Sequence, residues 1–228
     1  MSFALRLTED GLAAGARLSL PRAPRVLYVR NGALGIEIRP PTGHAGLAAP
    51  APINAGLIDT AWHGTGEIVL MADTPAVVLR FELLRGGAHR GDARGNDSRL
   101  LLEHAIDLDP ARAWLMRCDR VDFAPGGVAL PHGHKGGGIR CLLEGTLEVT
   151  VGDRLPRLMR PGDAWFESGR EPVLAKASPD TATAFVRVSI LPREIRGQSS
   201  IVYVDPADAG CGRPRQYTVY VDEPVVLP

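Results

Sequence analysis

The stretch GGVALPHGHKGGGIRCLLEG, residues 126–145, holds the features that decide the fold prediction. His132 and His134 are separated by one residue, so in an extended segment both imidazoles face the same side of the strand. Two imidazoles on one side can bind a single metal ion. The apolar run 139–143, which ends in a turn at Gly145, is typical of a strand that opens a hairpin. The stretch therefore predicts β-structure that carries a candidate metal or ligand site.

The rest of the chain shows the same β-pattern. Of its 228 residues, 26 are Gly and 19 are Pro, and this frequency of turn residues favours many short strands over long helices. Short apolar or alternating runs, bounded by turn residues, recur along the chain. These runs cover residues 26–29, 34–38, 68–71, 76–84, 113–123, 139–143, 147–151, 184–191 and 217–221. The predicted fold class is all-β, as a sandwich or a barrel.

The chain also contains an internal repeat, in which three segments match three later segments in the same order. The matching pairs are 18–23 with 128–133, 25–34 with 138–147, and 61–67 with 164–170. Ordered matches of this kind indicate two copies of one structural unit, with insertions and deletions in the loops. In this register His132 corresponds to Arg22, so any chemistry of the histidine pair belongs to the second copy.

The repeat predicts two related halves, residues 1–85 and residues 100–195. The segment 86–99 between them is rich in Gly and in charge, and it has no apolar periodicity, so we expect a linker loop there. Residues 196–228 contain one clear strand signal and are predicted as a C-terminal extension.

Net charge, cysteine usage and hydropathy narrow the class of protein. A formal net charge of zero provides no field that would concentrate nucleic acid or anionic lipid, so neither is an expected partner. Cys118, Cys141 and Cys211 are widely spaced and fit neither a disulfide framework nor a zinc ribbon, which favours a reducing compartment. The sequence shows no basic, apolar leader and no apolar run of membrane-spanning length. We therefore expect a cytoplasmic protein.

The spacing around the histidine pair resembles the first motif of the cupin superfamily, G-x5-H-x-H-x3-E-x6-G. Gly126, His132, His134 and Gly145 match its fixed positions, while Gly138 stands where the family has a glutamate ligand. The resemblance implies a double-stranded β-helix, the cupin jelly-roll barrel, in a bicupin whose N-terminal half is degenerate. It also implies a homodimer, because cupins are frequently dimers joined through sheet edges.

The second cupin motif, G-x5-P-x-G-x2-H-x3-N, is similar to the segment that begins at Gly162. The turn at its start matches, but Val173 occupies the place of the histidine, or Pro172 if one gap is allowed. Only two of the four metal ligands that the resemblance implies are therefore present.

Glu167 is the nearest carboxylate and a candidate third ligand. His132, His134 and Glu167 form the predicted metal set, for a divalent ion such as Fe, Mn, Ni or Zn. Glu167 is equally compatible with the role of a rim carboxylate, and His104 or His63 is a weaker option as a ligand. The histidine pair could also be two hydrogen-bonded residues that remain from an ancestral site.

Arg140 lies two residues beyond Gly138, so strand alternation places its side chain on the same inward face. The planar guanidinium fork matches a carboxylate, and Arg140 is therefore the predicted binding residue for a small carboxylic acid. The alternative is an internal salt bridge with Glu148, Glu167 or another acid.

Two functions of different classes fit these residues. The first is an enzyme in which a metal on the histidine pair polarises a substrate or activates dioxygen or water, while Arg140 orients a carboxylate. The resemblance implies a dioxygenase, a decarboxylase, an isomerase or a lyase without selecting among them. The second function is a non-catalytic module that binds or senses a small ligand or a metal. A purely structural barrel is a third possibility.

Overall fold

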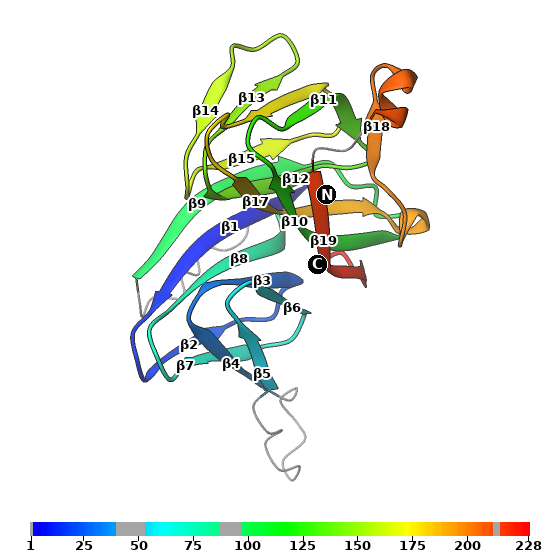
Figure 1. Ribbon diagram of the computed structural model, residues 1–228. Coiled ribbons are helices and arrows are strands. Elements are labelled where there is room, and N and C mark those ends of the chain that lie inside the picture. Colours follow the sequence, from blue (N-terminus) through cyan, green and yellow to red (C-terminus); the bar gives the residue numbers. More distant parts are fainter. Residues whose placement is uncertain (1, 40–52, 87–96, 212–214) are drawn as a thin grey trace. The chain divides into compact units, whose positions relative to one another are not determined.

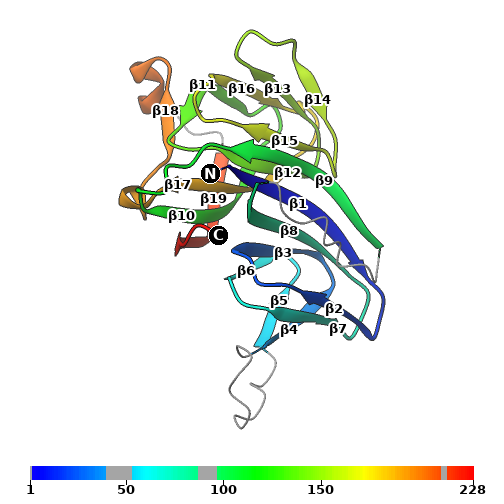
Figure 2. The same cartoon turned by 180° about the vertical axis from the view of Figure 1, so that it is seen from behind.

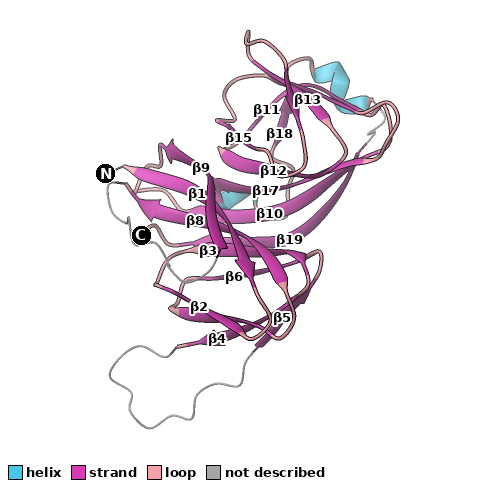
Figure 3. Cartoon of the chain, turned by 90° about the vertical axis from the view of Figure 1, so that its left-hand side faces the viewer, coloured by secondary structure: helices cyan, strands magenta, loops and turns pink. Residues whose placement is uncertain are grey.

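The computed structural model describes residues 2–39, 53–86, 97–211 and 215–228 of the chain. Strands make up most of the described residues, and Figure 3 shows them in magenta beside two short helical turns. The chain divides into two compact units, residues 1–110 with 226–228, and residues 111–225. None of the described helices is long and apolar enough to cross a membrane.

The first unit is formed by two antiparallel sheets. One sheet has the strand order β6-β3-β8-β1-β9 and the other has the order β2-β7-β4-β5 (Figure 1). The strands are β1 (Phe3–Leu12), β2 (Ala16–Leu20), β3 (Arg25–Asn31), β4 (Ala33–Ile38), β5 (Ile53–Leu57), β6 (Thr60–Gly64), β7 (Ile68–Ala72), β8 (Ala76–Arg85) and β9 (Asp97–Ile106). Alternating Leu, Val and Ile side chains from both sheets form one core between them.

The second unit repeats this plan. Its sheets have the strand orders β15-β12-β17-β10-β19 and β14-β13-β16-β11-β18, and the second sheet can be followed in Figure 2. The strands are β10 (Trp114–Phe123), β11 (Val128–His134), β12 (Gly138–Glu144), β13 (Leu147–Val151), β14 (Arg157–Met159), β15 (Ala164–Glu167), β16 (Val173–Ala177), β17 (Thr183–Pro192), β18 (Ile201–Tyr203) and β19 (Arg215–Val225). Two short 3-10 turns, η1 (Arg193–Ile195) and η2 (Pro206–Gly210), lie before and after β18.

The two related halves that the repeat predicts are confirmed. The first eight pairs of equivalent strands run from β1 and β10 to β8 and β17, and the sheet β6-β3-β8-β1-β9 has the same order as the sheet β15-β12-β17-β10-β19. The three matching segments fall on equivalent strands, namely β2 with β11, β3 with β12, and β6 with β15. The all-β jelly-roll fold class is thus correct, and β18 is an addition to the second unit.

The boundaries between the halves differ from the predicted ones. Strand β9 pairs with β1 and so belongs to the first unit, which ends at residue 110 and not at residue 85. Strand β19 pairs with β10 along its length, so the predicted C-terminal extension completes the second barrel. Both are edge strands with many exposed side chains, and their sequences therefore lack the strict apolar alternation of a buried strand. Residues 87–96 of the predicted linker lie outside the described residues.

The interior of the first barrel contains a matched set of charges. Arg25 Nε lies 3.1 Å from a carboxylate oxygen of Glu82, and Arg80 contacts both Glu82 at 2.6 Å and Asp10 at 2.7 Å. Ser98 Oγ donates a further hydrogen bond of 2.6 Å to Asp10. Among the described side chains, this network thus contains two guanidinium groups and two carboxylates. Its positive and negative charges are equal in number.

Candidate functional site

The two histidines lie on β11 of the second unit and both point into the barrel. Their side chains are buried, and the ring centroids are 4.9 Å apart in an edge-to-face arrangement. The Nδ1 atom of His132 lies 2.7 Å from the carbonyl oxygen of Leu130, which can only accept, so Nδ1 carries the proton. Burial lowers the pKa of His132, and in this neutral tautomer Nε2 carries the lone pair.

Glu167, on β15, meets His134 and Arg140 inside the barrel. Its Oε2 atom lies 3.3 Å from His134 Nε2 and 2.7 Å from Arg140 Nη2, the latter as an ion pair rather than an aligned hydrogen bond. Trp165 Nε1 donates a 2.8 Å hydrogen bond to the other oxygen, Oε1. The structure thus brings together all four residues that the sequence nominates, His132 included, and it also realises the alternative in which Arg140 forms an internal salt bridge.

The electrostatics of this cluster follow from burial and from the ion pair. Burial alone would raise the pKa of Glu167, but Arg140 and the hydrogen bonds from His134 and Trp165 outweigh it and hold that pKa below its usual range. Burial lowers the pKa of His134 to about 3 and that of Arg140 to about 10. At neutral pH the cluster therefore consists of a carboxylate, a guanidinium and neutral imidazoles.

Two further arginines, which the sequence reasoning missed, complete the interior. Arg187 on β17 forms a two-point ion pair with Asp119, at 2.6 Å and 3.0 Å. Arg215 opens β19, is buried, and donates a 3.2 Å hydrogen bond from Nη2 to the hydroxyl oxygen of Tyr203. The ring of Tyr217 lies 5.8 Å from the Arg187 guanidinium carbon and 5.7 Å from that of Arg215. One signal could have revealed Arg187, because it is the one charged residue in a buried and mostly apolar strand.

The charges in this interior do not balance. Arg140 pairs with Glu167 and Arg187 pairs with Asp119, whereas Arg215 has no carboxylate partner among the described residues. The Nε atom of Arg215 is buried and has no hydrogen-bond partner in the described part of the chain. With both imidazoles neutral, the described residues of this interior carry one surplus positive charge, and burial of such a charge is costly without an anion nearby.

The space beside these groups is small. A cavity of about 20 Å³ lies among the histidines and the arginines, which is enough for about one water molecule or one ligand oxygen. Its polar lining is His132, His134, Arg140, Glu167, Arg187, Arg215 and Tyr217, and its apolar floor includes Phe123, Leu147, Trp165 and Phe185.

The residues present do not fit the metal centre that the cupin resemblance implies. A Cβ atom at Gly138 would lie 2.5 Å from the carbonyl oxygen of Val188, so no ligand side chain can occupy the family's glutamate position. Val173, at the place of the third histidine, is buried and lies opposite His132 in the strand register. Both oxygens of Glu167 are engaged by donors. Among the described residues, no group of three or more His, Cys, Asp or Glu is arranged to hold a metal ion.

The two other histidines that the sequence offers as metal ligands belong to the first unit. His63 lies on β6 and His104 lies on β9, both in the first unit. Metal binding by His132, His134 and Glu167 therefore stays a prediction, and its third ligand is tied to Arg140 in this structure.

Comparison with known proteins places this site in a family context. Residues 119–173, which include both histidines and Glu167, match the family described as Cupin domain. The fold is similar to that of an oxalate decarboxylase variant from Bacillus subtilis, with a TM-score of 0.60, 11% identity, and coverage of 91% of this chain and 73% of that chain. None of the curated proteins matches the chain in sequence.

Two other solved structures show the same architecture. Salicylate 1,2-dioxygenase from Pseudaminobacter salicylatoxidans has a TM-score of 0.55 and 10% identity, over 95% of this chain and 75% of that chain. Procruciferin, an 11S globulin from Brassica napus, has a TM-score of 0.61 and 8% identity, over 81% of this chain and 75% of that chain. Enzymes and a globulin share this fold, so the fold alone does not select a function. Residues 119–173 of the second unit thus match the Cupin domain family, and both units share one jelly-roll strand order.

Proposed function

We propose that the second barrel binds a small organic anion through its carboxylate, and that Arg215 is the cation which receives it. The observation that carries this proposal is the buried guanidinium of Arg215, whose Nε has no partner and whose charge is not matched by a described carboxylate. A carboxylate would accept from Nε and restore the charge balance of the interior.

The neighbours of Arg215 support an anion in this place. The hydroxyl of Tyr203 accepts from Arg215 and keeps its own proton, which it can donate to a second ligand oxygen. The Arg140 guanidinium is paired with Glu167. In this proposal the ligand-binding role predicted for Arg140 therefore belongs to Arg215, and Arg140 stabilises the wall of the site through its ion pair. This function corresponds to the non-catalytic alternative that the sequence offers.

The first test is calorimetric titration of the full chain with acetate and with benzoate. We expect binding to the parent protein and a tenfold to hundredfold loss of affinity for Arg215→Gln, because a hydrogen bond to a charged group contributes about 1.5–3 kcal/mol. Arg154→Gln is the matched control, since Arg154 is exposed and pairs with Glu171 at the surface. Equal affinities for the parent and for Arg215→Gln would contradict the proposal.

A metal-dependent enzyme is the second candidate, and one observation favours it. The Nδ1 atom of His134 is buried without a hydrogen-bond partner among the described residues, and His134 is one of the residues that line the small cavity. Metal content measured after reconstitution with iron, manganese, nickel or zinc tests this candidate. We expect the parent and the double variant His132→Ala, His134→Ala to contain the same small amount, because Glu167 is held by Arg140. One equivalent of metal in the parent, absent from the double variant, would instead support the metal enzyme.

A further inference from the structure

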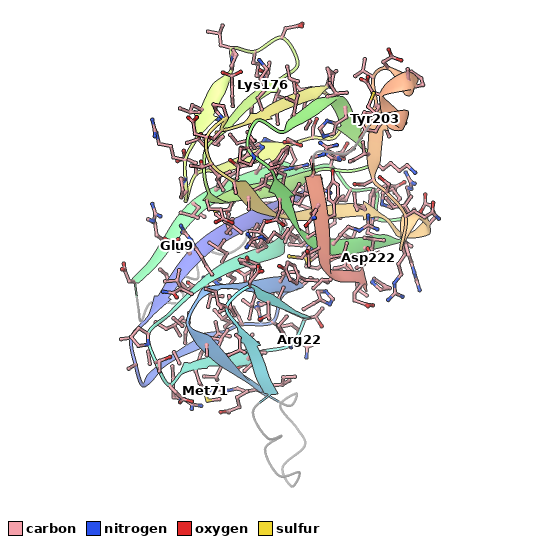
Figure 4. All side chains as sticks on the ribbon, viewed as in Figure 1. Glu9, Arg22, Met71, Lys176, Tyr203 and Asp222 are labelled. Carbon is pink, nitrogen blue, oxygen red and sulfur yellow. The ribbon has the colours of Figure 1, made fainter. Side chains whose placement is uncertain are left out.

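A second cavity, of about 340 Å³, lies within the second unit. It is bounded by residues of β10, β17 and β19 and by the segment 197–201, which leads into β18. Asp222, labelled on β19 in Figure 4, belongs to its wall. The volume falls in the range of small-molecule sites, which begins at about 300 Å³. This cavity can therefore hold an organic molecule, which the interior cavity cannot.

The two cavities adjoin each other. Arg187 and Tyr217 line both of them. The strand register gives a second link, because Ile201 of the larger cavity lies opposite His134, and Tyr203 lies opposite His132. An acid whose carboxylate oxygen reaches Arg215 would consequently extend past Tyr217 into the larger cavity.

The size of the interior cavity sets where the rest of the ligand lies. Its volume of about 20 Å³ accommodates one oxygen atom of a carboxylate and no carbon skeleton. Its apolar floor is closed by packed side chains such as Phe123 and Phe185. The adjoining cavity offers room for the remainder of an organic acid.

The charges around the larger cavity are already matched. Arg117 forms a two-point ion pair with Asp222, at 2.8 Å and 3.0 Å, and donates to the carbonyl oxygens of Gln198 and Ile195. Arg187 is paired with Asp119. The cavity therefore offers no free charge to the body of a ligand.

The remaining lining residues include uncharged polar ones and apolar ones. Ser199, Ser200 and Gln198 supply hydroxyl and amide groups, while Ile201 and the ring of Tyr217 supply apolar surface. Hydroxyl groups and a flat apolar face are the complement of a hydroxylated ring.

We infer that the larger cavity is the specificity pocket of the carboxylate site, and that the ligand is a hydroxylated, preferably aromatic, organic acid with a neutral body. This inference rests on the proposed function. The carboxylate lies at Arg215 and the body lies between Tyr217 and the segment 197–201.

Calorimetric titration with three probes tests the inference on the full chain. The first probe, 3-hydroxybenzoate, has both the carboxylate and the hydroxylated ring. Acetate has the carboxylate without the ring, and 3-hydroxybenzamide has the ring without the negative charge. We expect 3-hydroxybenzoate to bind at least tenfold more tightly than either of the other two probes. Equal affinity for the acid and the amide would overturn the assignment of the carboxylate, and equal affinity for the two acids would overturn the pocket.

One variant blocks the larger cavity with little effect on the core. Val219 lines the cavity and is 55% exposed, so Val219→Trp places an indole across it without displacing buried side chains. We expect this variant to bind 3-hydroxybenzoate at least tenfold more weakly and to bind acetate as the parent does. Val202→Trp is the matched control, because Val202 is 51% exposed on β18 and does not line the cavity.

The outcomes separate the two proposals. If Arg215→Gln weakens the binding of both acids while Val219→Trp weakens the binding of neither, the carboxylate site stands and the specificity pocket is overturned. If neither acid binds to the parent protein, the proposed function is overturned, and the pocket with it.

Discussion

Arg140→Met lowers the free energy of unfolding of the second unit by about 3–5 kcal/mol, because it leaves the buried carboxylate of Glu167 without its cation. The side chain of Met fills the space of the arginine stem, so the loss reports mainly the unpaired charge. Urea denaturation, followed by circular dichroism, measures this change. An unchanged free energy of unfolding would show that the ion pair does not hold the barrel together.

The double variant Arg140→Met, Glu167→Gln is the control for this result. It removes both charges and keeps an acceptor for Trp165, so it should be more stable than Arg140→Met alone. The pH dependence gives a second check. The pKa of Glu167 is depressed in the folded parent, so its contribution is present above the unfolded pKa of about 4.3 and is lost as the pH falls through the folded value. In Arg140→Met, burial raises that pKa, and the destabilisation should shrink as the pH is lowered and Glu167 is protonated.

Gly138→Glu, which restores the residue of the first cupin motif, prevents stable folding of the second barrel and creates no metal site. A Cβ atom at this position would lie 2.5 Å from both Val188 O and Ser189 Oγ, and the rest of the side chain would enter an interior with room for one water molecule. Overpacking costs about 1–3 kcal/mol, and an unpaired buried carboxylate costs several more. We expect loss of the cooperative unfolding transition or a large drop in its midpoint.

Gly210→Ala is the matched control for this variant. A Cβ atom at Gly210 would have no heavy atom within 4 Å, so the substitution should leave the unfolding midpoint unchanged. A stable Gly138→Glu protein that binds one equivalent of metal would contradict the prediction. Such a result would also show that the barrel can open around the glutamate position.

The fold could be predicted because its signals are local and repeated. The motif around His132 and His134 and the three matched segments fix strand positions, and strand alternation fixes which side chains face inward. Alternation also predicted that Arg140 faces the interior, while Glu167 was open between a ligand and a rim carboxylate. Alternation does not reveal which oppositely charged group a buried side chain contacts. In this structure Arg140 and Glu167 form an ion pair with each other.

The rest of the site depends on pairing between distant strands. Arg215 reaches the interior only because β19 pairs with β10, and nothing in the spacing of the sequence specifies that pairing. The same applies to β9, whose exposed residues give little apolar signal. The homodimer, the cytoplasmic location, and the absence of nucleic acid and membrane partners stay predictions.

The matched charges inside the first barrel bear on how the two copies diverged. In the strand register Arg80 lies opposite Leu27 and Arg187 lies opposite Arg140, so Arg80 and Arg187 occupy equivalent places in the two halves. Each has a carboxylate partner in its own barrel. Suppose that one ancestral barrel was duplicated. A neutral interior in the first copy and a single surplus arginine in the second would then be enough to give the first copy a structural role and the second a ligand-binding role. A binding function could thus arise in a duplicated domain through one unmatched side chain on an edge strand, with the shared framework left unchanged.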